Sequence, residues 1–190
     1  MTAVLKTVQR KDAADPIAEH VRAIIETLGE DVTRGGLAAT PARYAKALRY
    51  LAGGYAGDVA AAVGNGVFPA EGESPVLVRD IQFYSLCEHH LLPFHGRMQV
   101  GYLPGRRIIG LSKIPRIVDL FARRFQVQER LTEQVADALV ETLEPKGVVV
   151  VSEAQHLCMA MRGVQEHGAS TTVCATRGVA EPLLGMLRGS

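Results

Sequence analysis

Two short clusters of cysteine and histidine contain the residue types best suited to binding a transition metal. Cys87 and His90 are three positions apart in the run CEHH, and His156 and Cys158 are two positions apart further along the chain. A tight turn can direct side chains at the first spacing toward one ion, and residues two apart point to the same face of an extended segment. Thiolate and imidazole ligands favour zinc among the common cellular metals. The two clusters therefore predict a zinc site that contains Cys87, His90 and Cys158.

The number of ligands distinguishes a catalytic zinc site from a structural one. Structural sites usually have four protein ligands, whereas catalytic sites have three and leave one coordination position for water. Without a fourth cysteine nearby, the two clusters fit three ligands plus water better than a zinc ribbon. The spacing leaves His89 and His156 open as further ligands. Cys174 lies in a segment of high β-propensity without a nearby partner, so we expect it to be a small buried apolar residue.

Cations at the start of a predicted helix indicate a possible anion site. Lys113 and Arg116 lie in the first turn of a helix for which Ser112 is the expected cap. The free backbone N–H groups and the dipole at a helix N-terminus both favour phosphate, and nearby cations add to this preference. Arg162 follows Cys158 by four residues and would add a cation near the metal. For any one pair of cations a solvated helix face is the commoner explanation, but several cations near one zinc suggest a polyphosphate substrate.

A second pair of cations, Arg43 and Lys46, lies on the polar side of a predicted helix in the first third of the chain. These residues are three apart and therefore share one helix face. Elsewhere, Gln128 and Glu129 open another predicted helix. A carboxylate in that position is stabilised by the helix dipole, and it can also accept hydrogen bonds from the N1–H and the exocyclic amine of guanine. Purine recognition is thus the more specific hypothesis for Glu129.

The elements that must position these residues follow from the apolar periodicity. Helices are expected at residues 17–28, 40–52, 112–125 and 128–143, and strands at 76–83, 97–103, 147–153 and 170–176, with a loop at 64–75. Two pairs of strands with two helices between them predict an α+β fold, in which helices cover one face of an antiparallel sheet. We expect an N-terminal helical extension over residues 1–66 and a catalytic domain over residues 67–190.

The composition excludes several classes of protein. Of the 190 residues, 47% are hydrophobic and 22% are charged, and the net charge is only +1, which argues against a large nucleic-acid-binding surface. No apolar stretch is long enough to cross a bilayer, and the N-terminal residues do not resemble a targeting segment, so a cytoplasmic location without membrane contact is expected. An odd number of cysteines, three, favours metal binding over a disulfide framework.

Several sequence blocks, taken together, resemble the GTP cyclohydrolase I family. They are SLCEHHLLPFHG at 85–96, GLSKIPRIVDLFARRFQVQERLT at 110–132 and EAQHLCMAMRGVQEHG at 153–168, and TPARYAKAL at 40–48 is similar to an upstream block of that family. The blocks occur in the family's order between about residues 35 and 178. This order makes the resemblance far more specific than any single motif.

The resemblance implies a role for each matched position. Cys87, His90 and Cys158 would be the ligands of a Zn²⁺ ion, which moves His156 and His89 out of the metal shell and into proton transfer. The remaining matches imply guanine recognition by Gln128 and Glu129, and contacts to the ribose and triphosphate from Ser112, Lys113, Arg116 and Arg162, with Arg43 and Lys46 contributed by a neighbouring subunit.

The resemblance also implies an activity and an assembly. The family opens the imidazole ring of GTP by hydrolysis, releases formate and forms 7,8-dihydroneopterin triphosphate, the first step of folate and tetrahydropterin biosynthesis. The implied architecture is the tunnelling fold, in which the sheets of many subunits close into a barrel, here a homodecamer with active sites between subunits. Two alternatives are a related tunnelling-fold enzyme acting on another purine or pterin, and a non-catalytic zinc-binding homologue.

Overall fold

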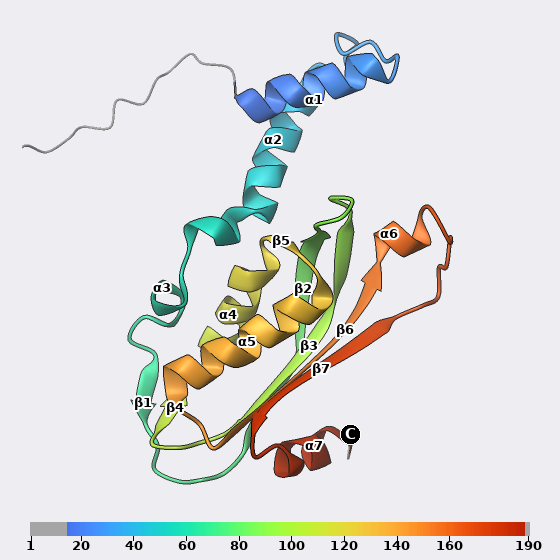
Figure 1. Cartoon of the computed structure of the whole chain (residues 1–190). Coiled ribbons are helices and arrows are strands. Elements are labelled where there is room, and N and C mark those ends of the chain that lie inside the picture. The colour runs from blue at the N-terminus through green and yellow to red at the C-terminus, as the bar shows by residue number, and fades with distance from the viewer. Residues whose placement is uncertain (1–14, 189–190) are drawn as a thin grey trace, which may run out of the picture. The chain divides into compact units, whose positions relative to one another are not determined.

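The computed structural model describes residues 15–188 and divides the chain into two compact units, one up to Tyr50 and the other from Leu51 onward (Figure 1). The first unit contains helices α1 (Pro16–Thr27) and α2 (Thr40–Leu51). The side chain of Asp15 caps α1 by accepting a hydrogen bond from the backbone of Ile17, and it also pairs with Arg49 of α2 at 2.7 Å. The boundary expected at residues 66 and 67 stays a prediction.

The second unit is built around a five-stranded sheet. Its strands, in the spatial order β5-β2-β3-β6-β7, are β5 (Phe125–Gln126), β2 (Val76–Cys87), β3 (Pro93–Leu103), β6 (Gly147–His156) and β7 (Thr171–Gly178). All neighbours pair antiparallel except β5, which runs parallel to β2. The predicted α+β class and antiparallel sheet are therefore confirmed.

Two helices, α4 (Lys113–Ala122) and α5 (Gln128–Leu143), cover one face of this sheet (Figure 1). Alternate strand residues point toward them, so that Met98, Val100 and Val150 are completely buried against Ile117 and Leu139 of the helices. Apolar residues two apart in the strands, and at helical spacing in α4 and α5, therefore face the same core. Within residues 15–188, no helix is long and apolar enough to cross a membrane.

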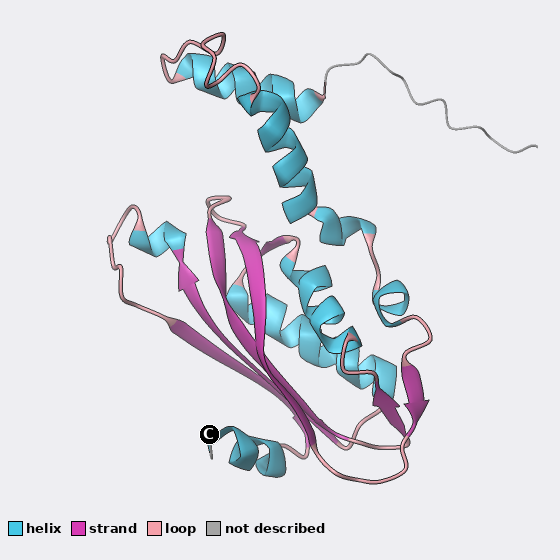
Figure 2. Cartoon of the chain, turned by 180° about the vertical axis from the view of Figure 1, so that it is seen from behind, coloured by secondary structure: helices cyan, strands magenta, loops and turns pink. Residues whose placement is uncertain are grey.

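The opposite face of the sheet is largely uncovered (Figure 2). Among residues 15–188, only α7 (Glu181–Arg188) packs against this face, at one end of it, where Leu183 is buried against Val149. Cys174 lies on the uncovered face and is exposed, so the prediction that it is buried was wrong. Its β-propensity indicated a strand correctly, but the face that a strand residue occupies depends on which side of the sheet the helices cover.

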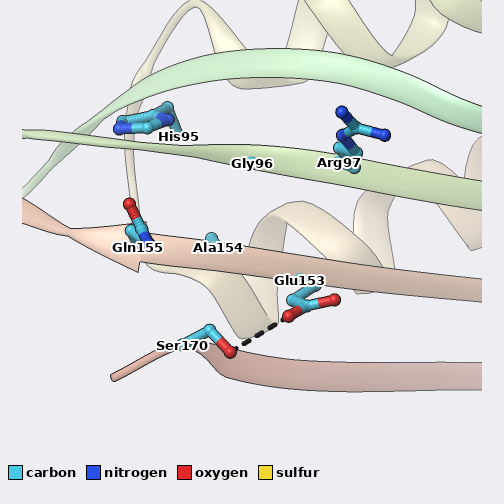
Figure 3. A pocket seen from close by; sticks show the side chains of 7 residues that line it. All are labelled: His95, Gly96, Arg97, Glu153, Ala154, Gln155 and Ser170. Atoms are coloured by element: carbon cyan, nitrogen blue, oxygen red, sulfur yellow. Dashed lines mark hydrogen bonds between the residues drawn. The ribbon is translucent and has the colours of Figure 1, made fainter. Parts of the chain in front are cut away.

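The uncovered face has a shallow pocket between β3 and β6, which Figure 3 shows. His95 lies at its rim with its ring stacked on Tyr84, at a centroid distance of 5.7 Å. The charged side chains there have partners close by, because Arg97 pairs with Asp80 at 3.0 Å and Glu153 accepts a hydrogen bond from Ser170. His95 thus lies on the face of the sheet opposite to α4 and α5, in contact with Tyr84.

Several local predictions need correction. The expected loop at residues 64–75 contains strand β1 (Val67–Pro69), which pairs with β4 (Arg107–Ile109), and it is preceded by α3 (Val59–Val63) and a 3₁₀ turn, η1 (Gly53–Ala56). The helix expected to reach Phe125 ends at Ala122, since Phe125 pairs with Leu86 of β2 instead. Strand β6 ends at His156, and Cys158 lies in the short helix α6 (Leu157–Ala160) rather than in an extended segment.

Candidate functional site

The predicted metal ligands converge at one end of the sheet. The ligand atoms of Cys87, His90 and Cys158 all lie within 4.8 Å of one another. Zinc binds sulfur at about 2.3 Å and imidazole nitrogen at about 2.0–2.1 Å in tetrahedral geometry. Ligand atoms around one zinc ion are therefore roughly 3.5–3.8 Å apart. A small inward movement of the three side chains would bring them to these separations. This group is the only one of its kind in the part of the chain that the structure describes, and neither His89 nor His156 belongs to it.

A tight turn after β2 brings the first two ligands together. The backbone carbonyl of Cys87 accepts hydrogen bonds from His90 and Leu91, while the N–H of Cys87 donates to Leu92 at 2.8 Å. Leu91 closes the turn in the left-handed region, with φ of 54°, a conformation that costs a non-glycine residue about 1 kcal/mol. The turn is also bound to β5, because the N–H of Glu88 donates to the carbonyl of Gln126 at 3.0 Å.

The third ligand, Cys158, comes from the first turn of α6, directly after β6. Burial raises the pKa of its thiol above the ordinary value, and the neighbouring Cys87 shifts the pKa in the same direction. Two thiols this close together disfavour ionisation unless a cation compensates for their charge. A bound divalent metal would provide that compensation, which is consistent with the chemistry of this donor set.

His156 lies next to the metal group, at the end of β6. Its ring stacks on Phe94, the residue paired with it on β3, with centroids 4.8 Å apart and planes only 3° from parallel. Its Nε2 lies 2.8 Å from Oε1 of Gln128. Burial lowers the pKa of His156, an effect that the negative charge of Glu129 partly opposes. The ring is therefore held on one face by an aromatic side chain and at one nitrogen by an amide.

His89 occupies a more open position beside Cys87 of the metal group. Its Nδ1 lies 3.6 Å from the sulfur of Cys87, and its side chain is 63% exposed. It is therefore close to the metal group and remains accessible to a substrate.

A pocket of about 230 Å³ opens between these groups. Its lining includes Cys87, His89, Phe94, Glu129, His156 and Cys158. The pocket combines a sulfur-rich metal group, two histidines and one carboxylate within a partly apolar wall, which is the mixture expected of a small-molecule site. Glu129 is exposed, whereas the neighbouring Gln128 is only 1% exposed.

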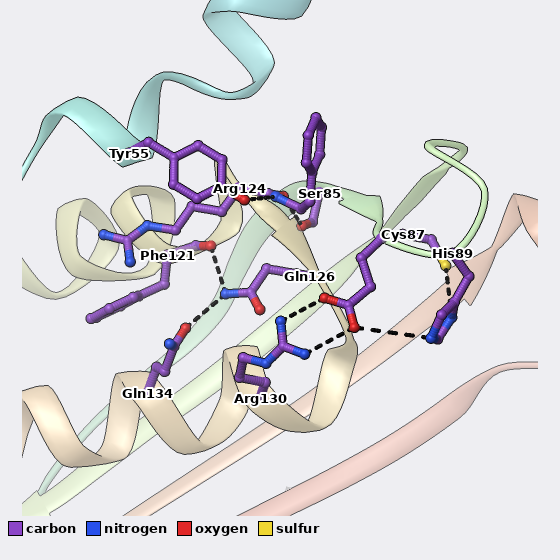
Figure 4. Close-up of polar contacts among 11 residues, drawn as sticks. Tyr55, Ser85, Cys87, His89, Phe121, Arg124, Gln126, Arg130 and Gln134 are labelled. Atoms are coloured by element: carbon purple, nitrogen blue, oxygen red, sulfur yellow. Dashed lines mark hydrogen bonds and ion pairs between the residues drawn. The ribbon is translucent and has the colours of Figure 1, made fainter.

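An ion pair and a hydrogen-bond network hold the wall of this pocket, as Figure 4 shows. Arg130 of α5 forms two hydrogen bonds with the carboxylate of Glu88. Glu88 lies in the turn from Cys87 to Leu91, called the metal turn below. Behind them, the side chain of Gln126 donates to Phe121 and Gln134, which joins β5 to both helices. The sequence did not single out Glu88, Arg130 or Gln126. Their only signal was their position beside residues that were already candidates.

The predicted cations are distributed unevenly. Nη1 of Arg162 lies 2.9 Å from Nε2 of His90, as expected for a cation close to the metal. Ser112, Lys113 and Arg116 instead lie at the start of α4, next to β4, and the helix runs away from them toward β5 (Figure 1). Ten residues of helix span about 15 Å, so these residues are at the opposite end of α4 from the metal turn.

The remaining predicted phosphate contacts lie in two places. Ser112 occupies the N-cap position of α4 as predicted, but within the described residues its hydroxyl makes no capping hydrogen bond. Its backbone is already helical, with φ of −67° and ψ of −14°, and this conformation does not favour the usual capping geometry. Arg43 and Lys46 lie on α2 in the first compact unit, and their function stays a prediction.

Comparison with known proteins identifies the family. The family model described as GTP cyclohydrolase I matches residues 17–182, which include every residue of the site. The chain belongs to the GTP cyclohydrolase I family. A protein of Deinococcus radiodurans named GTP cyclohydrolase 1 is 55% identical over 92% of this chain and 81% of its own length. Proteins with the same name from Campylobacter jejuni and Porphyromonas gingivalis are 52% and 47% identical over 84% and 92% of this chain, and over 84% and 90% of their own lengths.

Among solved structures, an archaeosine synthase QueF-Like in the apo form is similar to this member of the family, with a TM-score of 0.48 and 17% identity. The similarity covers 57% of this chain and 98% of that structure.

Proposed function

We propose that this chain is a GTP cyclohydrolase I. It opens the imidazole ring of GTP by hydrolysis, releases formate and rearranges the remainder to 7,8-dihydroneopterin triphosphate. The observation that carries this proposal is the pocket in which the Cys87, His90 and Cys158 group lies beside His156 and Glu129. Membership of the family and about 50% identity to named relatives support it independently.

The metal in this proposal is Zn²⁺, held by Cys87, His90 and Cys158. When bound, zinc lowers the pKa of a coordinated water, which supplies a nucleophile for the guanine C8 near neutral pH. The donor set fits this ion, because two thiols and one imidazole form the three-ligand arrangement of a catalytic site. The close approach of the two thiols supports the presence of a compensating cation.

The histidines of the pocket move protons in this scheme. His156 gives a proton to the imidazole nitrogen of guanine as the ring opens, a task that suits an imidazole because its ring nitrogens can both carry and release a proton. His89, exposed beside Cys87, and Ser112 act in the later rearrangement of the ribose. None of the three is needed as a metal ligand.

Substrate recognition is divided between the purine and the phosphates. Glu129 accepts hydrogen bonds from the N1–H and the 2-amino group of guanine, and it rejects adenine because adenine lacks both donors. The triphosphate and ribose bind to cations: Lys113, Arg116, Arg162, Arg43 and Lys46. Within one chain, Lys113 and Arg116 begin the helix whose other end approaches the metal turn, so a complete site requires residues of more than one subunit.

This division supports the proposed assembly. The uncovered face of the antiparallel sheet and the open edge of β7 are compatible with a tunnelling-fold barrel, and we propose a cytoplasmic homodecamer with active sites between subunits. No contact with nucleic acid or membrane is proposed.

The test is to measure zinc per chain together with formate release and a fluorescent oxidised pterin after incubation with GTP. The proposal predicts one zinc per chain and equal amounts of the two products. The variant His156→Ala should keep its zinc and its assembly but lose turnover by several orders of magnitude, whereas His95→Ala, on the opposite face of the sheet, should resemble the wild type. Turnover of a different purine or pterin, or full activity of His156→Ala, would contradict the proposal.

A further inference from the structure

The side chain of Gln128 is buried at the start of α5, and all of its hydrogen-bonding groups are used within the chain. Its Nε2 lies 3.1 Å from the carbonyl oxygen of Ser152 and 2.9 Å from that of Thr171. Carbonyl oxygens can only accept, so the group facing them must be the NH₂ of the amide. The hydrogen-bond partners thereby fix which end of the amide is nitrogen, an assignment that is otherwise ambiguous for glutamine.

The other end of the amide fixes the state of His156. Because Oε1 of Gln128 can only accept, the hydrogen bond of 2.8 Å to Nε2 of His156 requires a proton on that nitrogen. In the neutral ring Nδ1 is then unprotonated. Stacking on Phe94 prevents the ring from turning out of this plane without losing the contact.

A ring of buried hydroxyls supports the glutamine. The hydroxyl of Thr132 donates to the carbonyl of Gln128 at 2.7 Å, so its contact with Ser152, also at 2.7 Å, must be donated by the serine hydroxyl. The oxygen of Ser152 then accepts from Nε2 of Gln128 at 3.0 Å, and because the NH₂ group has two hydrogens for three acceptors, one hydrogen is shared. Every donor finds an acceptor in a single direction around the ring. Thr132 and Ser152 are completely buried, so water does not compete for these bonds.

We propose that Gln128 is a positioning residue that holds His156 with its Nε2 protonated, so that Nδ1 is the nitrogen that exchanges the proton with substrate. The side chain of Gln128 does not read the guanine, although the resemblance to the family suggested that it does. Of these two side chains, only that of Glu129, which is exposed, forms hydrogen bonds with the guanine base. The exchange of a proton with substrate rests on the proposed function, whereas the hydrogen bonds that orient His156 do not.

A double-mutant cycle tests the proposal. Gln128→Met keeps the approximate volume and removes the amide. We expect kcat to fall by roughly 10- to 100-fold, the usual effect of losing a residue that orients a functional histidine, while KM for GTP changes less than about twofold. In the His156→Ala background the same substitution should cause no further loss. Gln82→Met is the matched control and should leave both constants unchanged, because Gln82 is exposed on β2, on the face of the sheet opposite to α4 and α5.

Binding of GTP to His156→Ala, with and without Gln128→Met, separates positioning from recognition. Equal affinities support positioning. A large rise in KM or Kd for GTP on substitution of Gln128 would overturn the proposal. So would a further fall in kcat when Gln128→Met is added to His156→Ala. Either result would assign Gln128 to substrate binding.

The ¹⁵N resonances of His156 in the zinc-loaded wild-type enzyme test the same idea without any Gln128 variant, which matters if Gln128→Met does not fold. A protonated Nε2 and an unprotonated Nδ1 in the neutral ring are expected, and the reverse assignment would refute the proposal. This measurement needs no turnover, so an enzyme that failed to convert GTP would disprove the proposed function while the tautomer was still tested.

Discussion

The carboxylate of Glu88 and the guanidinium of Arg130 meet in a two-pronged ion pair, with N–O distances of 2.6 and 2.9 Å. Glu88 lies between the proposed metal ligands Cys87 and His90 in sequence, and Arg130 directly follows Glu129. The hydrogen bonds of Arg130 hold the pKa of Glu88 below its ordinary value. This pair therefore joins the turn that carries Cys87 and His90 to the turn of α5 that carries Glu129.

Exchange of the two charges tests this tie. Glu88→Arg and Arg130→Glu should each weaken zinc retention and lower kcat, because each leaves two like charges opposed at the pocket wall. The double exchange should recover part of both losses. Zinc content after dialysis against a chelator, together with formate release, measures the effect. If the double variant were as poor as the worse single variant, the pair would not be acting as a unit.

Substitution of each cysteine in turn should show which of the three bind zinc. Cys87→Ser and Cys158→Ser are expected to lose zinc and turnover, whereas Cys174→Ser should keep both, because Cys174 is exposed on the opposite face of the sheet. Treatment of the wild type with a strong chelator should abolish activity, and added zinc should restore it. Zinc retention in Cys158→Ser would contradict the ligand set.

Glu129→Gln tests recognition of guanine. Its amide cannot accept from both donors of the base as the carboxylate does, and we expect kcat/KM for GTP to fall roughly thirtyfold, equivalent to about 2 kcal/mol for a hydrogen bond to a charged group. Zinc content and thermal stability should stay unchanged. Glu141→Gln, near the other end of α5, is the matched control. Unchanged kcat/KM for GTP would exclude Glu129 as the reader of the base.

Gly96 should be intolerant of any side chain. A Cβ at this position would lie 1.8 Å from the carbonyl oxygen of Glu153 and 2.7 Å from the Cα of Ala154, both parts of the backbone of β6. Gly96→Ala is expected to destabilise the fold by about 3 kcal/mol or more, since neither strand can move without disturbing the sheet. Gly185→Ala, within α7 and with nothing inside 4 Å, should instead stabilise the helix by about 0.5–1 kcal/mol. Thermal unfolding distinguishes the two.

The cap of α1 should depend on pH. The hydrogen bonds that Arg49 donates lower the pKa of Asp15 below its ordinary value of 3.8. A carboxylate with a lowered pKa stabilises the folded state above the ordinary value, and this contribution is lost as the pH falls through the lower, folded value. Hydrogen-exchange protection of α1 should therefore decrease in acid below about pH 4. Asp15→Asn, which can still cap but lacks the charge, should remove most of that pH dependence.

Much of the fold was predictable because its signals are local. Apolar residues at helical spacing predicted α4 and α5, and alternation predicted β3, since each periodicity reflects burial on one side of an element. The errors came at element ends. Phe125 continues the apolar stripe of α4 but pairs with β2, and Cys158 follows a strand but begins a helix, because contacts with neighbouring elements override a weak local preference.

By itself, the sequence determined the chemical groups that this protein offers: two thiols, three nearby histidines and a carboxylate. The spacing of the thiols and histidines favours zinc, and the carboxylate suits recognition of a purine. Only the tertiary structure decided which of these groups cooperate. It gathered Cys87, His90 and Cys158 into one group and exposed Cys174, and it buried the amide of Gln128 between two carbonyls and His156. The physical reason is that hydrogen-bond direction and burial depend on partners from distant parts of the chain, which no local pattern of residues specifies.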